Sequence, residues 1–224
     1  MSILEYFVSI LAPHTCMGCG NEGALLCANC GGGLRRAVAR RYRCHKVTTL
    51  SQTCKSCRRQ TKLTRVRALT TYEQSAKDLV WRLKFGRAKV GAAEIGRLLA
   101  SLLSETAQSE NLILVHVPTA TSRVRRRGYD QAALITKALA REAGLPRASL
   151  LLRAGQQRQV GGSRAKRREQ IKDAFRARKP RAIQNAYIVL IDDVVTTGAT
   201  LEAAAATLKA AGAKKVEAVV FAQA

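Results

Sequence analysis

The stretch Tyr187-Ile-Val-Leu-Ile-Asp-Asp-Val-Val-Thr-Thr-Gly-Ala-Thr200 decides the fold of this chain. Its first five residues, 187–191, form an unbroken apolar run rich in β-branched side chains, which predicts a strand buried on both faces. Two carboxylates and a loop of small residues follow, and 201–211 are dominated by the helix formers Ala and Leu. The stretch therefore predicts a buried strand that leads through an acidic pair and a tight loop into a helix.

The loop suits a phosphate group, and the acidic pair suits a sugar. Small residues let backbone N–H groups approach an anion, and the positive end of the following helix favours a phosphate there. Carboxylates repel a phosphate, but they suit ribose hydroxyls or a Mg²⁺ that itself holds sugar and diphosphate oxygens. We therefore expect Asp192 and Asp193 to be the catalytic carboxylates of a sugar-phosphate site. The residues expected to hold the phosphate are Thr196, Thr197, Gly198, Ala199 and Thr200.

Apolar runs and helical patterns alternate through the rest of the chain from residue 66 onward. Strands are predicted over 66–72, 112–117, 149–152 and 215–222, and helices over 75–85, 91–104, 132–143 and 163–175. This alternation predicts an α/β fold with a parallel sheet flanked by helices. Ligands of such sheets bind beyond the carboxyl ends of the strands, where the acidic pair lies and where a loop follows residue 117.

That second loop, residues 118–131, is rich in arginine. Guanidinium groups match the oxygens of a diphosphate, and a solvated basic loop is the alternative. The residues expected to bind pyrophosphate are Pro118, Arg123, Arg126 and Arg127.

All seven cysteines lie between residues 16 and 57. Two Cys-x-x-Cys pairs supply the four thiolates of a structural Zn²⁺, namely Cys16, Cys19, Cys27 and Cys30. A second site is expected at Cys44, Cys54 and Cys57, with His45 as a candidate fourth ligand. Spacing leaves a crossed arrangement open, in which the first pair joins the last. We expect a zinc-binding module over 1–62 and a second domain over 63–224.

The net charge of +24 is far from neutral for 224 residues. Such a field attracts polyanions, so nucleic acid is the favoured partner, with an acidic membrane surface or a highly charged host proteome as alternatives. The charge is concentrated in 35–46 and 153–181. Residues 2–11 are apolar but too short to span a bilayer, and they lack the basic start of a signal peptide. We expect an amphipathic helix there and a cytoplasmic protein.

Two motifs resemble known families. The acidic pair and its loop resemble the PRPP (phosphoribosyl pyrophosphate) motif of type I phosphoribosyltransferases, and neither the Walker loop nor the dinucleotide fingerprint occurs in this chain. The run Arg126-Arg-Gly-Tyr-Asp-Gln131 resembles the Arg-Arg-Gly-Phe-Asn-Gln signature of the ComF/GntX family, in which a cysteine-rich module precedes the phosphoribosyltransferase domain. Lys84-Phe85 and Gln159-x-Gly161-x-x-Arg164-x-x-Arg167 fit the same family. The resemblance covers essentially the whole chain, although Val47 stands where a cysteine is usual.

This resemblance implies a type I phosphoribosyltransferase fold that binds PRPP with Mg²⁺. It also implies a flexible loop that closes over the substrate, with Gln159, Gly161, Arg164 and Arg167 in it. Alternatively, this basic segment lines a groove for single-stranded nucleic acid. A ComF-type competence protein would bind single-stranded DNA during natural transformation, beside other competence proteins such as a ComF-type helicase. The other hypotheses are a metabolic phosphoribosyltransferase that acts on a free base, and a regulator that binds PRPP as a signal.

Overall fold

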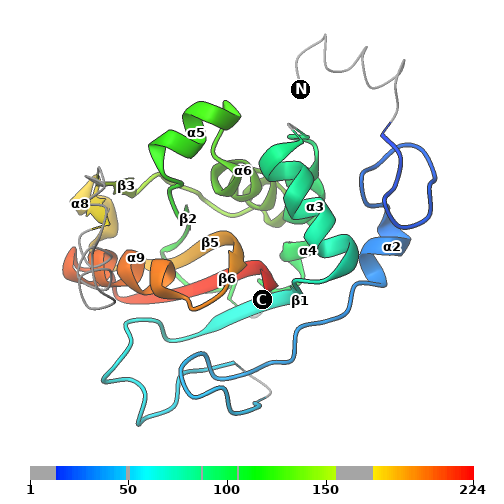
Figure 1. The fold of residues 1–224 in the computed structure, drawn as a ribbon. Helices are drawn as coiled ribbons and strands as arrows, with labels where there is room; N and C mark the ends of the chain where they lie inside the picture. Colours follow the sequence, from blue (N-terminus) through cyan, green and yellow to red (C-terminus); the bar gives the residue numbers. More distant parts are fainter. Residues whose placement is uncertain (1–13, 49–50, 87, 105, 155–173) are drawn as a thin grey trace, which may run out of the picture.

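The computed structural model describes residues 14–48, 51–86, 88–104, 106–154 and 174–224 (Figure 1). The helix predicted over 2–11 lies outside the described residues. So do the four residues predicted for the flexible loop, Gln159, Gly161, Arg164 and Arg167. The helix predicted over 163–175 also falls mostly outside them, and at its described end Phe175 begins a strand instead of ending a helix.

Four parallel strands form the central sheet, which confirms the predicted α/β class. Their order is β1 (Val66–Thr71), β6 (Lys215–Gln223), β5 (Tyr187–Val195) and β2 (Leu112–His116). The two middle strands, β5 and β6, are almost entirely buried, because each is covered on both faces. The unbroken apolar run that opens β5 is the pattern that such a position requires.

Helices cover both faces of the sheet (Figure 1). One face packs against α3 (Gln74–Phe85), α4 (Gly91–Ala100) and α6 (Gln131–Ala143). The other face packs against α9 (Ala199–Ala210), α8 (Pro180–Ile183) and a small antiparallel pair, β3 (Leu151–Arg153) and β4 (Phe175–Ala177). None of the helices among the described residues is long and apolar enough to cross a membrane.

Two predicted boundaries differ from the structure near the site. The central strand does not end at residue 191 but continues through the acidic pair to Val195. The segment predicted as a loop over 118–131 contains a helix, α5 (Thr121–Arg127), which ends at Gly128 in a left-handed conformation. The predicted arginine loop is therefore short, and all four of its arginines lie on a helix.

The first cysteine-rich segment, which carries α2 (Ala28–Gly32), packs directly on α4. The carboxylate of Glu94 accepts the N–H groups of Leu25 at 2.7 Å and Leu26 at 2.8 Å. Both leucine side chains are buried in the same core cluster as α3 and α4. The division of the chain at 62 and 63 remains an expectation, because this segment contributes side chains to the core of the larger domain.

Candidate functional site

The two carboxylates of the acidic pair have different surroundings. Successive side chains of a strand face opposite sides of its sheet, so Asp192 and Asp193 meet different neighbours. Asp193 is buried, and its Oδ2 lies 2.8 Å from the Nζ of Lys84, at the end of α3. Asp192 forms no ion pair with any described residue, and its Oδ1 accepts the N–H of Asp193 at 2.9 Å. The structure therefore leaves Asp192 as the carboxylate available to a ligand.

Burial, and then the negative charge of Asp193, raise the pKa of Asp192 well above its ordinary value. An isolated carboxylate in such a place is destabilised when it ionises, and a bound cation would offset that penalty. Oxygen ligands are what Mg²⁺ prefers. The surroundings of Asp192 thus fit a divalent cation, while Lys84 already neutralises Asp193.

The predicted phosphate loop lies directly beyond β5. Thr196 and Thr197 are exposed, and Gly198 has a φ of 70°, the left-handed conformation that favours glycine. The N–H groups of Gly198 and Thr200 donate to none of the described residues, while that of Ala199 is 3.5 Å from the hydroxyl of Thr197. Free N–H groups at the first turn of the 12-residue helix α9 are available to an anion.

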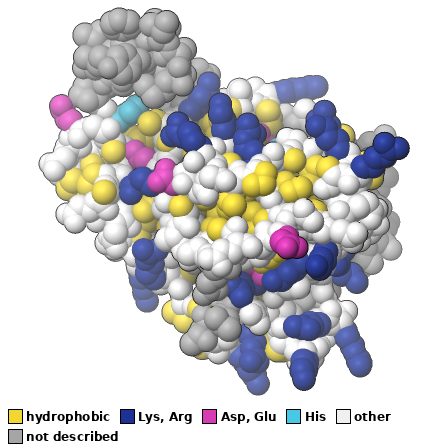
Figure 2. Space-filling model, turned by 180° about the vertical axis from the view of Figure 1, so that it is seen from behind, with side chains coloured by type: hydrophobic (Ala, Val, Ile, Leu, Met, Phe, Trp, Pro, Cys, Tyr) yellow, Lys and Arg dark blue, Asp and Glu magenta, His cyan; other side chains and the backbone are white. Residues whose placement is uncertain are grey.

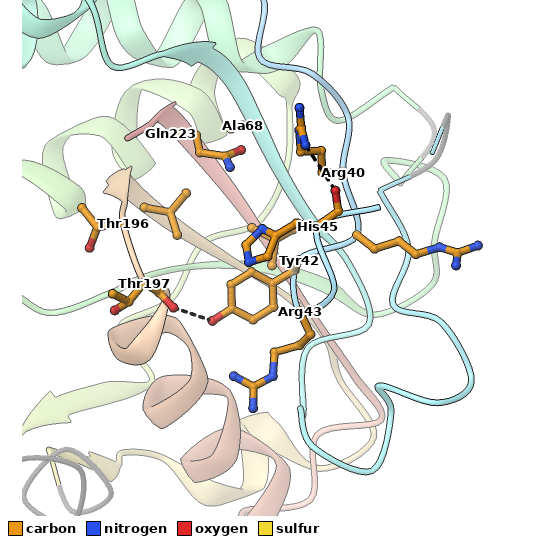
Figure 3. Close-up of a pocket in the computed structure, with 11 residues that line it drawn as sticks. Arg40, Tyr42, Arg43, His45, Ala68, Thr196, Thr197 and Gln223 are labelled. Carbon is orange, nitrogen blue, oxygen red and sulfur yellow. Dashed lines mark hydrogen bonds between the residues drawn. The ribbon is translucent and has the colours of Figure 1, made fainter. Parts of the chain in front are cut away.

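Tyr42 belongs to the second cysteine-rich segment, residues 40–57, and contacts this loop (Figure 3). Its hydroxyl donates to the carbonyl of Thr197 at 3.3 Å. Its ring lies so close to Gly198 that a Cβ at that position would overlap it. Burial, and then the charge of Glu202, raise the pKa of Tyr42 to about 12, so the phenol keeps its proton and remains a donor. Sequence reasoning missed this residue, because Tyr42 is 155 positions away from Thr197.

A pocket of about 390 Å³ separates the cysteine-rich segment from the strand ends (Figure 3). It has an apolar floor and a basic and aromatic wall, and none of the described residues that line it is acidic. The lining residues are Arg40, Arg41, Tyr42, Arg43, His45, Val66, Ala68, Val195, Thr196, Thr197 and Gln223. The pocket shares its two threonines with the phosphate loop, so ligands in the two places would be neighbours.

The predicted pyrophosphate residues are divided between two elements. Pro118 follows β2, and its carbonyl accepts from Arg153 at 3.4 Å. Arg123, Arg126 and Arg127 lie on α5, the first two exposed. Arg127 is half-buried and donates to the side chain of Gln131 at 2.8 Å. Burial lowers the pKa of Arg127, while the negative charge of Asp193 opposes that shift, which places this guanidinium in the field of the acidic pair.

The signature over 126–131 positions the elements around it. Tyr129 is buried, and its hydroxyl donates to the carbonyl of Leu83, one residue before Lys84. Asp130 caps α6 and also accepts the N–H of Thr119 at 2.8 Å. The signature thus ties the segment after β2 to the end of α3.

The first four cysteines come together. The sulfurs of Cys16, Cys19, Cys27 and Cys30 all lie within 4.8 Å of one another. A Cβ on Gly18 would lie 2.7 Å from the Cys30 sulfur, so a side chain at this position would displace that sulfur. A backbone hydrogen bond from Cys27 is the largest cause that lowers the pKa of Cys16, to about 6. Four clustered sulfurs, one of them poised to ionise, fit a tetrahedral Zn²⁺.

The second cluster contains three sulfurs, those of Cys44, Cys54 and Cys57, also within 4.8 Å of one another. Among the described residues no fourth side chain joins them, and His45 lines the pocket instead. The Ser56 hydroxyl, 3.1 Å from the Cys54 sulfur, is the largest cause that lowers the Cys54 pKa, to about 6. This set fits a thiophilic cation with one coordination position left to another ligand. The crossed arrangement of cysteines is wrong.

Comparison with known proteins agrees with this geometry. Residues 90–224 match the family described as "Phosphoribosyl transferase domain", which gives the class of the fold and site. The chain is 30% identical to the "DNA utilization protein YhgH" of Salmonella typhimurium, over 93% of this chain and 96% of that protein. It is 29% identical to the "Competence protein ComFC" of Streptococcus pneumoniae (88% and 87%) and of Bacillus subtilis (74% and 69%). The chain belongs to the ComF-like branch of the phosphoribosyltransferase family.

Proposed function

We propose that this chain is a competence or DNA-utilisation protein that binds PRPP with Mg²⁺ and handles single-stranded DNA. The names of its relatives support the biological setting. The observation that carries PRPP binding is the free carboxylate of Asp192, followed within a few residues by the unoccupied N–H groups of Gly198 and Thr200. One end of this arrangement suits a sugar diol, and the other end suits a phosphate. A cytoplasmic location and a competence helicase as partner belong to the same proposal.

Each part of the site has a proposed role. The residues from Thr196 to Thr200 bind the 5-phosphate, and Asp192 binds ribose hydroxyls and the cation. Mg²⁺, when bound, neutralises diphosphate charge. We assign the diphosphate to Pro118 and Arg127, because Pro118 follows β2 and Arg127 lies in the field of Asp193. Lys84 is a positioning residue, because it holds Asp193 and so keeps the end of β5 in register with α3.

Calorimetric titration with PRPP and Mg²⁺ tests this site. We expect Asp192→Asn to weaken binding at least tenfold, while Asp78→Asn, which removes the same charge from an exposed position on α3, leaves it unchanged. Asp193→Asn is a poor test, since it strands the buried end of Lys84 and should lower the free energy of unfolding by about 3 kcal/mol. Equal PRPP affinity in wild type and Asp192→Asn contradicts the assignment.

The pH dependence of cation-assisted binding is a second readout of Asp192. The carboxylate binds a cation only when deprotonated, and an ordinary aspartate remains so down to about pH 4. The pKa of Asp192 is raised, so this carboxylate takes up its proton at a higher pH than an ordinary aspartate. PRPP affinity should therefore begin to fall with decreasing pH well above about pH 4. In Asp192→Asn this part of the pH profile should be flat.

The basic surface supports the DNA half of the proposal. Figure 2 shows Lys and Arg side chains along the edges of the face in view, with few acidic side chains among them. Within the described part of the chain, Arg40, Arg41 and Arg43 form no ion pair with a carboxylate, so their charges are available to phosphates. Cations that contact phosphates release counterions when the strand binds, and affinity then depends on salt.

Fluorescence anisotropy with a single-stranded oligonucleotide tests this half. The logarithm of the affinity should fall linearly with the logarithm of salt concentration, by about 0.7 per phosphate contact. Replacing Arg40, Arg41 and Arg43 together with Ala should flatten the slope by about two, and sequence preference should not change, because phosphates carry no sequence information. Replacing Arg164, Arg167 and Arg168 tests the second basic segment in the same way. A wild type without salt dependence contradicts DNA binding.

A second candidate function is the transfer of phosphoribose from PRPP to a base or another acceptor. The observation in its favour is the 390 Å³ pocket beside Thr196 and Thr197, into which the side chain of Gln223 brings an amide. Release of diphosphate from PRPP, measured with and without free bases, distinguishes turnover from binding alone.

A further inference from the structure

Helix α3 exposes two large aromatic side chains that do not pack in the core. Its inner face is complete, with Ala76, Leu79, Val80 and Leu83 all buried. Trp81 is 55% exposed and Phe85 is 53% exposed. They lie four residues apart and therefore on the same face of the helix, with ring centroids 5.8 Å apart. Trp81 is the only tryptophan of a chain in which aromatic residues are scarce.

Two arginines of α5 lie close to the exposed ring of Phe85. The guanidinium carbon of Arg127 lies 5.2 Å from the ring centroid, and that of Arg126 lies 6.0 Å from it. Both distances are within the range of cation–π attraction. Arg126 forms no ion pair with the described residues, so the patch combines flat apolar faces with an uncompensated positive charge.

We propose that Trp81 and Phe85 form a stacking platform for the bases of single-stranded nucleic acid, with Arg126 beside it to contact the backbone. This inference rests on the proposed DNA function and names where the bases bind. A base stacks on an aromatic side chain whatever its sequence, because every base has a π-face. The flanking cations complement a phosphate backbone. An apolar protein surface would instead bury these cations without an anionic partner, which is unfavourable. The charge around the patch therefore selects a nucleic acid as its occupant.

The platform adjoins the proposed PRPP site. In the last turn of α3, Lys84 turns inward to Asp193 while Phe85 turns outward to the arginines of α5. A strand stacked on Trp81 and Phe85 would thus lie beside the end of α3 that contacts Asp193 of the acidic pair. The proposed platform and the ion pair between Lys84 and Asp193 therefore lie on neighbouring residues of one helix end.

Intrinsic fluorescence offers a direct test, because all tryptophan emission comes from residue 81. We expect oligo-dT to quench that emission and its affinity to fall about 5- to 150-fold in Trp81→Ala. Trp81→Phe, which keeps a flat ring, should retain most of the affinity. Leu152→Ala is the matched control, since it removes an exposed apolar side chain of similar exposure away from the platform. Thermal unfolding of each variant checks that the fold is intact.

Salt and an abasic strand separate stacking from charge. Trp81→Ala should lower affinity equally at all salt concentrations, since stacking releases no counterions, whereas Arg126→Ala should reduce the slope by about 0.7. An abasic strand of the same length offers phosphates without bases. Wild type and Trp81→Ala should bind the abasic strand equally well.

Three results overturn the platform while leaving DNA binding in place. They are an unquenched emission at saturation, an unchanged affinity in both Trp81→Ala and Phe85→Ala, or an abasic strand that binds wild type as tightly as oligo-dT. A wild type that binds neither strand contradicts the proposed DNA function itself. Binding of oligo-dT by wild type therefore distinguishes a failure of the platform from a failure of the proposed DNA function.

Discussion

The two cysteine clusters are attached to different parts of the domain, and they differ in their ligand sets. The four-sulfur cluster is joined to α4 through Glu94 and lies beside the core cluster that contains Leu25 and Leu26. The three-sulfur cluster takes Cys44 from a hairpin over 40–47, whose Tyr42 contacts the phosphate loop. We expect the first cluster to hold its segment in the core and the second to position Tyr42 against the site. Breaking each cluster should therefore have a different consequence.

The largest effect is expected at the four-sulfur cluster. Cys16→Ser removes one of four thiolates, and structural zinc in small modules is bound with an apparent free energy of about 10–16 kcal/mol. We expect loss of one metal equivalent and rapid proteolysis within 14–34, measured by metal analysis and limited digestion. Cys44→Ser is the control, and it should leave 14–34 protected. Normal protection in Cys16→Ser would show that the leucines alone hold this segment.

The attachment to α4 should come next in size. Glu94→Ala leaves the N–H groups of Leu25 and Leu26 buried without their charged acceptor, and hydrogen bonds to charged groups contribute about 1.5–3 kcal/mol each. We expect the free energy of unfolding in urea to fall by about 3 kcal/mol. Glu94→Gln keeps one acceptor oxygen, so its free energy of unfolding should lie between those of wild type and Glu94→Ala. A loss below about 1 kcal/mol would mean that solvent replaces the carboxylate.

The smallest effect tests whether the three-sulfur cluster acts through Tyr42. The N–H of Arg41 bonds to Lys46 at 2.9 Å and that of His45 to Arg41 at 2.8 Å, so Cys44 and Tyr42 share one tight turn. Tyr42 fixes the carbonyl of Thr197. In a trans peptide this directs the N–H of Gly198 the opposite way, as an anion site needs. Tyr42→Phe and Cys44→Ser should each weaken PRPP binding about fivefold.

The double variant gives the decisive comparison. If the cluster acts through Tyr42, the effects of Tyr42→Phe and Cys44→Ser should be less than additive. Amide exchange over 197–200 gives a readout that does not depend on PRPP, and Cys44→Ser should accelerate it. Full additivity, or unchanged exchange in Cys44→Ser, would separate the cluster from the loop.

Local patterns in the sequence predicted the centre of the fold well. The apolar run of β5, the small loop and the Ala-rich helix α9 are encoded within one short stretch, and the structure confirms their order. Helix α5 escaped prediction because Thr121–Arg127 has Val124 as its only large apolar residue, so it shows no helical periodicity. The pair β3 and β4 was missed in part because three-residue strands carry little signal.

Long-range contacts explain what could not be predicted at the site. Spacing predicted that both aspartates were equivalent ligands, but only the packing of α3 brings Lys84 to Asp193. Spacing also left the grouping of the cysteines open, because every pair has the same Cys-x-x-Cys form. The contact of Tyr42 with Thr197 joins two segments that no local pattern relates. Each of these pairings depends on tertiary structure.

The contact between Tyr42 and Gly198 also constrains how the family can vary. Gly198 meets two separate demands, a positive φ and a ring packed against its α-carbon. A relative that gains a side chain at position 198 must therefore lose the large side chain at position 42, and a relative with a small residue at 42 is released from one of the two demands. Positions 42 and 198 should therefore vary together among relatives. A side chain at position 198 should occur only where the residue at position 42 is small.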